Sequence, residues 1–169
     1  MTGQQMYFDE VKIGQAIPEV RKGPMTVAHI MRWSASMENW HRIHYDKAYA
    51  VEHDKLPDVV VNGSWKQHVL MQLVKDWAGL AGWAWKVAFQ YRDMDIPGDL
   101  ITAWGKVTRK YERDGVSYVE LDIGLKNSRG VESTKGTAVV VLPKRGGEAR
   151  NRITSLSSWP VPRQATGNG

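Results

Sequence analysis

The sequence predicts an α+β fold in which one long central helix packs against one face of an antiparallel β-sheet. Apolar residues recur at steps of four from Trp65 to Trp77, which is the period of a helix with one buried face. Beyond Gly79, apolar and polar residues alternate, and turn sequences divide the remaining chain into strands. One long helix followed by hairpin-connected strands is typical of an α+β domain.

The segment before the long helix is expected to hold a second, shorter helix. Residues 7–15 predict a short extended opening that ends at a glycine turn. Thr26 is a candidate N-cap, and the apolar spacing after it predicts a helix to about Met37. After a break at residues 56–58 the long helix follows, and Gly79 is its candidate C-cap.

Four strands are expected after the long helix, because the apolar residues there have a period of two. The expected strands are residues 85–91, 100–110, 117–123 and 137–142. Glu112–Gly115 carries the composition of a hairpin turn. The last strand is almost continuously apolar, which predicts a central position in the sheet.

The length of 169 residues predicts one domain, at residues 6–143, followed by a basic Gly/Pro/Ser-rich C-terminal tail at residues 144–169. The tail holds five basic residues and one acidic residue, so it carries +4 of the net charge of +5. The body of the domain is therefore nearly neutral. This distribution argues against a nucleic-acid partner.

The composition also limits the compartment and the chemistry. The chain has no cysteine, which excludes disulfides, thiolate metal sites and a cysteine nucleophile. Its N-terminus lacks a signal-peptide pattern, and no stretch approaches the roughly 20 apolar residues of a membrane span. We expect a cytoplasmic protein without a membrane partner.

Residues 38–46 hold the densest group of reactive side chains in the sequence. Two imidazoles, two carboxylates, an amide and a guanidinium fall within these nine residues, between the two expected helices. Polar side chains are costly to bury without partners, so core packing does not explain this density. The segment is therefore the candidate functional site.

This segment resembles the signature of the MaoC-like (R)-specific enoyl-CoA hydratases and 3-hydroxyacyl dehydratases, Asp-x-Asn-Pro-x-His-x-Asp. His44 matches the signature histidine, and Asn39 stands where the signature has its aspartate. Residues 39–46 are nearest to the branch of the mesaconyl-C4-CoA and 3-methylfumaryl-CoA hydratases, whose wording is close to Phe-Asn-Ala-His-Arg-Ile-His-Tyr-Asp. The resemblance covers about residues 7–143. It implies a hot-dog fold, in which a curved sheet wraps the long helix, and a homodimer or larger assembly.

Hydration of an enoyl thioester requires a base, a group that holds the water, and donors for the thioester oxygen. His44 is the candidate base, because an unperturbed imidazole has a pKa of about 6.5. Asn39 cannot exchange a proton at neutral pH, but it can hold the water. Delivery of the proton to the α-carbon then falls to His44 itself or to Glu38, for which a solvated surface position is the alternative.

The other polar residues of the segment are candidates for supporting roles. His41 and Arg42 are expected to brace the loop or to meet the substrate. Asp46 is expected to fix the loop by accepting backbone N–H groups. Trp40 belongs either to an aromatic wall of the acyl site or to ordinary packing. We predict no metal site, because His41, His44 and Asp46 lack a further firm ligand at a suitable spacing.

Asn62, Gly63 and Ser64 open the long helix and are the candidate oxyanion and substrate-binding residues. The first N–H groups of a helix have no partner within the helix, and the helix dipole favours negative charge there. The resemblance implies that the Gly63 N–H is the oxyanion donor. The alternative is a glycine that only permits the turn.

The resemblance thus implies an enoyl-CoA hydratase or 3-hydroxyacyl-thioester dehydratase, a hydro-lyase acting on an acyl-CoA or acyl-carrier-protein thioester without a cofactor beyond the CoA of the substrate. Two alternatives stay open. The first is an acyl-CoA thioesterase of the same fold, which generally uses an Asp or Glu where this chain has only Gln67. The second is a non-catalytic partner subunit of a heteromeric hydratase, which Asn39 favours. The acyl group, carrier, direction and stereochemistry are also open.

Overall fold

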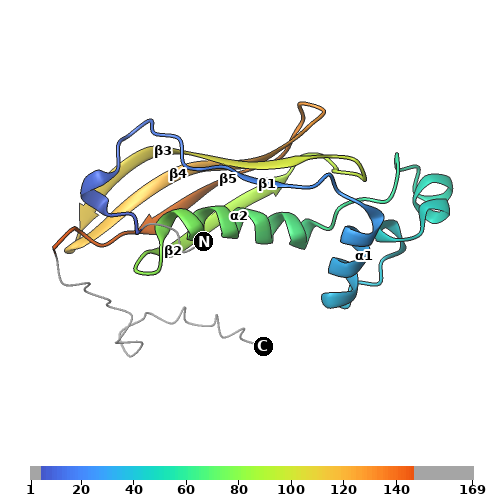
Figure 1. Cartoon of the computed structure of the whole chain (residues 1–169), viewed down its shortest axis with the longest axis horizontal. Coiled ribbons are helices and arrows are strands. Elements are labelled where there is room, and N and C mark those ends of the chain that lie inside the picture. Colours follow the sequence, from blue (N-terminus) through green and yellow to red (C-terminus); the bar gives the residue numbers. More distant parts are fainter. Residues whose placement is uncertain (1–4, 147–169) are drawn as a thin grey trace, which may run out of the picture.

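The computed structural model describes residues 5–146, which form one antiparallel sheet of five strands with a long helix along one face (Figure 1). The helices are α1 (Val27–Ser36) and α2 (Gly63–Ala78), and the strands are β1 (Val20–Lys22), β2 (Trp83–Tyr91), β3 (Ile101–Arg113), β4 (Val116–Asn127) and β5 (Glu132–Val141). The order across the sheet is β1-β3-β4-β5-β2. The predicted α+β fold is confirmed.

Helix α2 buries one face against the sheet, as its sequence period predicts. Its apolar face is almost inaccessible: Val69, Leu70, Leu73 and Val74 are each exposed by 1% or less. The helix ends at Gly79, whose φ of 74° lies in the region that favours glycine. The central helix thus forms the core with residues of β3, β4 and β5.

The sheet follows the predicted hairpins, with differences in extent. Asp114 and Gly115, at φ 52° and 73°, form the two-residue turn between β3 and β4, and both dihedrals suit the Asp-Gly turn of a twisted hairpin. The middle strand of the sheet is β4, and β5 lies between β4 and the edge strand β2, so the last strand is an inner strand, as predicted, but not the middle one. The almost continuous apolar sequence of the last strand did not show which of the neighbouring inner strands, β4 or β5, is the middle one.

The N-terminal region differs most from expectation. Residues Phe8–Glu10 form a turn of 3-10 helix within the expected extended opening. The short edge strand β1 was not predicted, because three residues give no readable period. Thr26 is the N-cap of α1, accepting from the His29 N–H at 3.2 Å, while the His29 side chain accepts from the Thr26 N–H at 3.2 Å. Figure 1 shows α1 beyond the N-terminal end of α2, away from most of the sheet.

The expected boundary between domain and tail falls at the end of the described residues. Leu142 is buried in the core, and Lys144 and Arg145 form ion pairs with Glu112 and Glu10 on the surface of the domain. Residues 147–169, most of the expected tail, lie outside the described residues. The assignment of 144–169 as a separate tail stays a prediction. Within residues 5–146 no helix is both long and apolar enough to span a membrane.

Candidate active site

A cavity of about 560 Å³ opens where the polar segment meets the start of α2. Its walls come from four parts of the chain: the segment around His44, residues 54–61 before α2, the first turn of α2, and the end of β2 with the loop that follows. The residues that face it are His41, Ile43, His44, Asp54, Leu56, Val60, Val61, Gly63, Lys66, Tyr91, Asp93 and Met94. The structure therefore brings together His41, His44 and Gly63 of the predicted site residues.

His44 is only 7% exposed, and its orientation is fixed by the main chain. Its Nδ1 lies 2.8 Å from the Val60 carbonyl oxygen. A carbonyl can only accept a hydrogen bond, so Nδ1 carries the proton in the neutral ring and Nε2 carries the lone pair. Burial lowers the pKa of His44 below its ordinary value of 6.5, against the opposing effect of the Val60 hydrogen bond. The imidazole is thus neutral at pH 7 with Nε2 able to accept a proton.

The Val60 carbonyl is itself held by hydrogen bonds on both sides of the residue. The Val60 N–H donates to the Ile43 carbonyl at 3.0 Å, next to His44. The Val61 N–H donates to the Asp95 carbonyl at 2.8 Å. These bonds tie the polar segment, the approach to α2 and the loop after β2 into one wall of the cavity.

Gly63 is required by a close approach of Tyr91. A Cβ added at Gly63 would lie 2.9 Å from two ring carbons of Tyr91 and 3.0 Å from its hydroxyl. Burial raises the pKa of Tyr91, so the phenol stays protonated at neutral pH. No side chain caps the start of α2, so the Gly63 N–H, at its first residue, has no partner within the helix. The absence of a side chain at Gly63 therefore lets the Tyr91 ring pack against the first turn of α2.

The side chains of Asn62 and Ser64 turn away from this role. Asn62 Nδ2 donates to Ser34 Oγ at 3.0 Å, and Ser64 Oγ accepts from the Trp33 indole N–H at 2.9 Å. Neither side chain lines the cavity. Both side chains therefore hold α1 against the start of α2. The sequence did not predict this structural role, because the bonded residues are far apart in the chain.

Asn39 is half-buried and lies outside the lining of the cavity, where it bonds to the main chain of His41. Its Oδ1 accepts from the His41 N–H at 3.2 Å. The His41 Nδ1 in turn accepts from the Ile43 N–H at 3.5 Å, so the proton of neutral His41 is on Nε2. The His41 and His44 ring centroids are 6.2 Å apart. The cavity therefore holds one histidine with a proton-accepting Nε2 and one with a proton-donating Nε2.

The remaining residues of the segment lie at its surface. Arg42 pairs with Asp46 at 2.8 Å, and the Asp46 Oδ1 accepts the Tyr49 N–H at 3.0 Å. Asp46 thus accepts a backbone N–H of the loop, and the Tyr49 N–H and Arg42 together lower its pKa. Glu38 and Trp40 are exposed and do not line the cavity.

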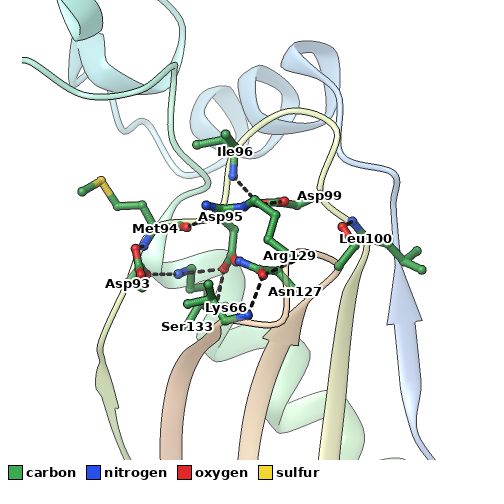
Figure 2. A network of polar contacts seen from close by, with 12 residues as sticks. Lys66, Asp93, Met94, Asp95, Ile96, Asp99, Leu100, Asn127, Arg129 and Ser133 are labelled. Atoms are coloured by element: carbon green, nitrogen blue, oxygen red, sulfur yellow. Dashed lines mark hydrogen bonds and ion pairs between the residues drawn. The ribbon is translucent and has the colours of Figure 1, made fainter.

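A buried ion pair in the cavity wall was missed from the sequence. Lys66 and Asp95 are 3% and 0% exposed, and Lys66 Nζ lies 2.8 Å from Asp95 Oδ2. Asp95 also accepts from Ser133 Oγ at 2.6 Å and from Asn127 Nδ2 at 2.9 Å. Figure 2 shows these side chains converging between α2 and the ends of β4 and β5.

Further bonds extend this network along the loop after β2. The Lys66 Nζ donates to the Asp93 carbonyl at 2.7 Å. The Arg129 Nε donates to Asp99 Oδ1 at 2.9 Å, and Asp99 Oδ2 accepts the Ile96 N–H at 2.9 Å (Figure 2). The loop that forms one side of the cavity is therefore anchored to both the helix and the sheet. Across residues 5–146, no group of three His, Asp or Glu side chains is arranged to hold a metal ion.

Solved structures with the same fold include hydratases. R-hydratase PhaJ1 from Pseudomonas aeruginosa is 16% identical with a TM-score of 0.73, over 84% of this chain and 88% of that one. The (R)-hydratase from A. caviae involved in PHA biosynthesis is 21% identical with a TM-score of 0.69, over 79% and 98%. The ChsH1–ChsH2 complex from Mycobacterium tuberculosis is 20% identical with a TM-score of 0.67, over 78% and 98%. These similarities confirm the hot-dog fold.

No curated protein sequence matches the chain. The sequence model of hydroxyacyl-thioester dehydratase type 2 matches residues 10–97, just over half of the chain. The matched region contains α1, the polar segment, α2 and the loop that carries Asp95. The chain belongs to the hydroxyacyl-thioester dehydratase type 2 family.

Proposed function

We propose that the protein is an enoyl-thioester hydratase, or in reverse a 3-hydroxyacyl-thioester dehydratase, with His44 as its base. One observation carries the proposal: the Val60 carbonyl fixes the proton of His44 on Nδ1 at 2.8 Å, inside a cavity that also contains the start of α2. A neutral imidazole with a free Nε2 is the group that abstracts a proton from water. Membership of the hydroxyacyl-thioester dehydratase type 2 family supports a thioester as the substrate.

In the hydration direction, His44 Nε2 takes a proton from water, and the resulting hydroxide forms a bond to the β-carbon. The electrons of the double bond move to the thioester oxygen, where the Gly63 N–H and the positive end of the α2 dipole stabilise the negative charge. The imidazolium then returns its proton to the α-carbon, which restores neutral His44. Because one residue both removes and delivers the proton, no carboxylate is required at position 39.

The Nε2–H of His41 is proposed to hold the attacking water, and Asn39 is proposed to position His41 for this task. The Asn39 Oδ1 already fixes the His41 main chain at 3.2 Å, so the two residues act as a unit. The similarity of residues 39–46 to the mesaconyl-C4-CoA and 3-methylfumaryl-CoA hydratases supports placing the chain near that branch, where an asparagine stands at the same position. Glu38 is exposed, which makes His44 the better candidate for proton delivery.

The test is turnover by the purified protein. Hydration bleaches the absorbance of an α,β-unsaturated acyl-CoA, whereas a thioesterase releases a thiol that a thiol reagent detects. We expect His44→Ala to lower turnover by at least about 10²-fold, the contribution of a positioned acid–base group. The matched control is His53→Ala, because His53 is an exposed histidine outside the cavity lining. A His44→Ala protein with nearly unchanged turnover would refute the assignment of the base.

A homodimer is the proposed assembly. Strand β2 lies at one edge of the sheet, so its outer edge is available to pair with a second copy. The ChsH1–ChsH2 complex shows that proteins of this fold also form assemblies of two different chains. If the pure protein neither bleaches enoyl-CoA esters nor releases thiol from short, branched, aromatic or steroid-sized substrates, the role of a non-catalytic partner subunit replaces the proposal.

A further inference from the structure

A second cavity, of about 370 Å³, lies at the other side of the first turn of α2. Gly63 and Lys66 line the candidate active site, whereas Trp65, between them in the sequence, lines the second cavity. Its other walls come from β1 and α1.

The second cavity is basic, and its positive charges are not neutralised. Lys22 and Arg32 line it, together with His29, and no Asp or Glu does. Neither Lys22 nor Arg32 forms an ion pair or a side-chain hydrogen bond within residues 5–146. By contrast Arg21, the neighbour of Lys22 on β1, pairs with Glu19 at 2.9 Å and does not line the cavity. Two cations left without counter-charges beside one cavity point to an anionic ligand.

His29 adds a third donor with a defined direction. Its Nδ1 accepts from the Thr26 N–H at 3.2 Å, in the capping box of α1. The proton of the neutral ring is therefore on Nε2, which remains a donor. The bond from the Thr26 N–H to Nδ1 thus keeps the proton of the neutral His29 ring on Nε2. This nitrogen can therefore donate a hydrogen bond to a ligand without a charge on the ring.

The cavity also has aromatic walls, of which Trp33 is held in place by a hydrogen bond. Trp33 donates its indole N–H to Ser64 Oγ at 2.9 Å, and its ring centroid is 5.1 Å from that of His68. Trp33 and Trp65 are both half-buried and line the same cavity. Indole rings held in this way offer flat surfaces on which a heteroaromatic base stacks, and base–aromatic stacking is favourable for every base.

We propose that this second cavity binds the phosphorylated adenosine of coenzyme A, with the phosphates at Lys22, Arg32 and His29 and the adenine against the tryptophans. The proposal rests on the proposed function, because the acyl thioester of the same molecule would occupy the first cavity. It makes CoA, rather than an acyl carrier protein, the carrier. A carrier protein presents only a phosphopantetheine arm, which has one phosphodiester and no base to stack.

The binding test uses the full chain and requires no turnover. Calorimetric titration with CoA, adenosine 3′,5′-bisphosphate and 4′-phosphopantetheine separates the two ends of the ligand. We expect CoA and the bisphosphate to bind and to quench tryptophan fluorescence, with an affinity that falls as salt is raised. Phosphopantetheine should bind at least about tenfold more weakly. Equal affinity for phosphopantetheine and the bisphosphate, or no binding of the bisphosphate, would overturn the proposal.

Variants then locate the site. Lys22→Ala and Arg32→Ala should each weaken bisphosphate binding by about tenfold, the factor expected for the loss of one charge-assisted hydrogen bond. Arg21→Ala is the matched control and should bind normally, because Arg21 lies on the same strand outside the cavity. Arg32 is exposed, so its replacement should leave folding intact, which the melting temperature checks. A loss in Arg21→Ala equal to that in Arg32→Ala would show only a general charge effect and would contradict the proposal.

Kinetics distinguish this proposal from the proposed function. With an enoyl-CoA ester, Arg32→Ala should raise KM by about tenfold at constant kcat, because binding at a remote part of the substrate is lost. With the corresponding N-acetylcysteamine thioester, which has no nucleotide, KM should not change. An equal rise in KM for both substrates would refute the nucleotide site while leaving the hydratase intact. Binding of the bisphosphate without turnover would instead refute only the hydratase.

Discussion

Replacement of Lys66 tests whether the buried ion pair sustains the wall of the candidate active site. Lys66→Met keeps the length of the side chain but removes the ammonium that lies 2.8 Å from Asp95. The Asp95 carboxylate, 0% exposed, would then keep only the hydrogen bonds from Ser133 and Asn127. An uncompensated buried charge is costly because its desolvation is no longer offset.

The expected cost follows from this burial. Breaking a buried pair by removing one partner lowers the free energy of unfolding by roughly 3–5 kcal/mol. For a protein of this size each kcal/mol shifts the melting temperature by about 2–4 °C, so we expect a decrease of about 6–20 °C. Asp95→Asn should cost a similar amount, because it leaves the Lys66 ammonium without its carboxylate.

The double variant separates the pair from its surroundings. In Lys66→Met/Asp95→Asn no charge is left, and an amide at position 95 can accept from Asn127 and donate to the Ser133 hydroxyl. Urea unfolding of the four proteins should therefore give a double-variant loss at least about 2 kcal/mol smaller than the sum of the two single losses. A Lys66→Met loss below about 1 kcal/mol, or strictly additive losses, would refute the reasoning.

Three further outcomes test the site and the domain boundary. Asn39→Asp should keep or raise hydratase activity, because a carboxylate also accepts the His41 N–H, whereas Asn39→Leu loses this bond and should abolish the activity; an active leucine variant would make the position structural. Burial lowers the pKa of His44, so neutral His44 should persist below pH 6.5 and the acid limb of kcat/KM should lie below that value. The unfolded chain binds the proton first as pH falls through 6.5, so this residue's contribution lowers the free energy of unfolding from there down to the folded pKa. An acid limb above pH 7 assigned to this residue would contradict the pKa shift. Truncation after Gly146 should leave activity and melting temperature nearly unchanged, and a decrease of more than about 8 °C would show that the tail docks on the domain.

The parts of the fold that the sequence predicted are those with local causes. The Thr26 cap depends on residues three positions apart, and the α2 face depends on a repeat within one helix. Asp-Gly is a sequence that hairpin turns with positive φ at both central residues prefer, and Asp114 and Gly115 have such φ values. Strand order is different, because it depends on pairing across the sheet, which no local pattern in the sequence shows.

The candidate site was predictable only where residues are close in sequence. The polar residues around His44 identified it as a candidate site residue. Its hydrogen-bond partner is the main-chain carbonyl of Val60, and the sequence does not predict this contact because every residue type has such a carbonyl. The Lys66–Asp95 pair had a readable signal that was missed. Lys66 shares the buried face of α2 with Leu70 and Leu73, and a lysine in that position requires an acidic partner elsewhere in the chain.

Because a main-chain carbonyl orients His44, side chains in the cavity walls can be replaced without changing the orientation of this base. No side-chain replacement at Val60 removes the oxygen that holds His44 Nδ1. A proline would keep this oxygen but delete the N–H that donates to the Ile43 carbonyl. Leu56 and Met94 form apolar walls of the same cavity and make no bond to the imidazole. Their replacement by smaller or larger side chains can therefore adapt the protein to other acyl groups while His44 keeps its tautomer, which makes these two positions the natural targets for redesign of chain-length preference.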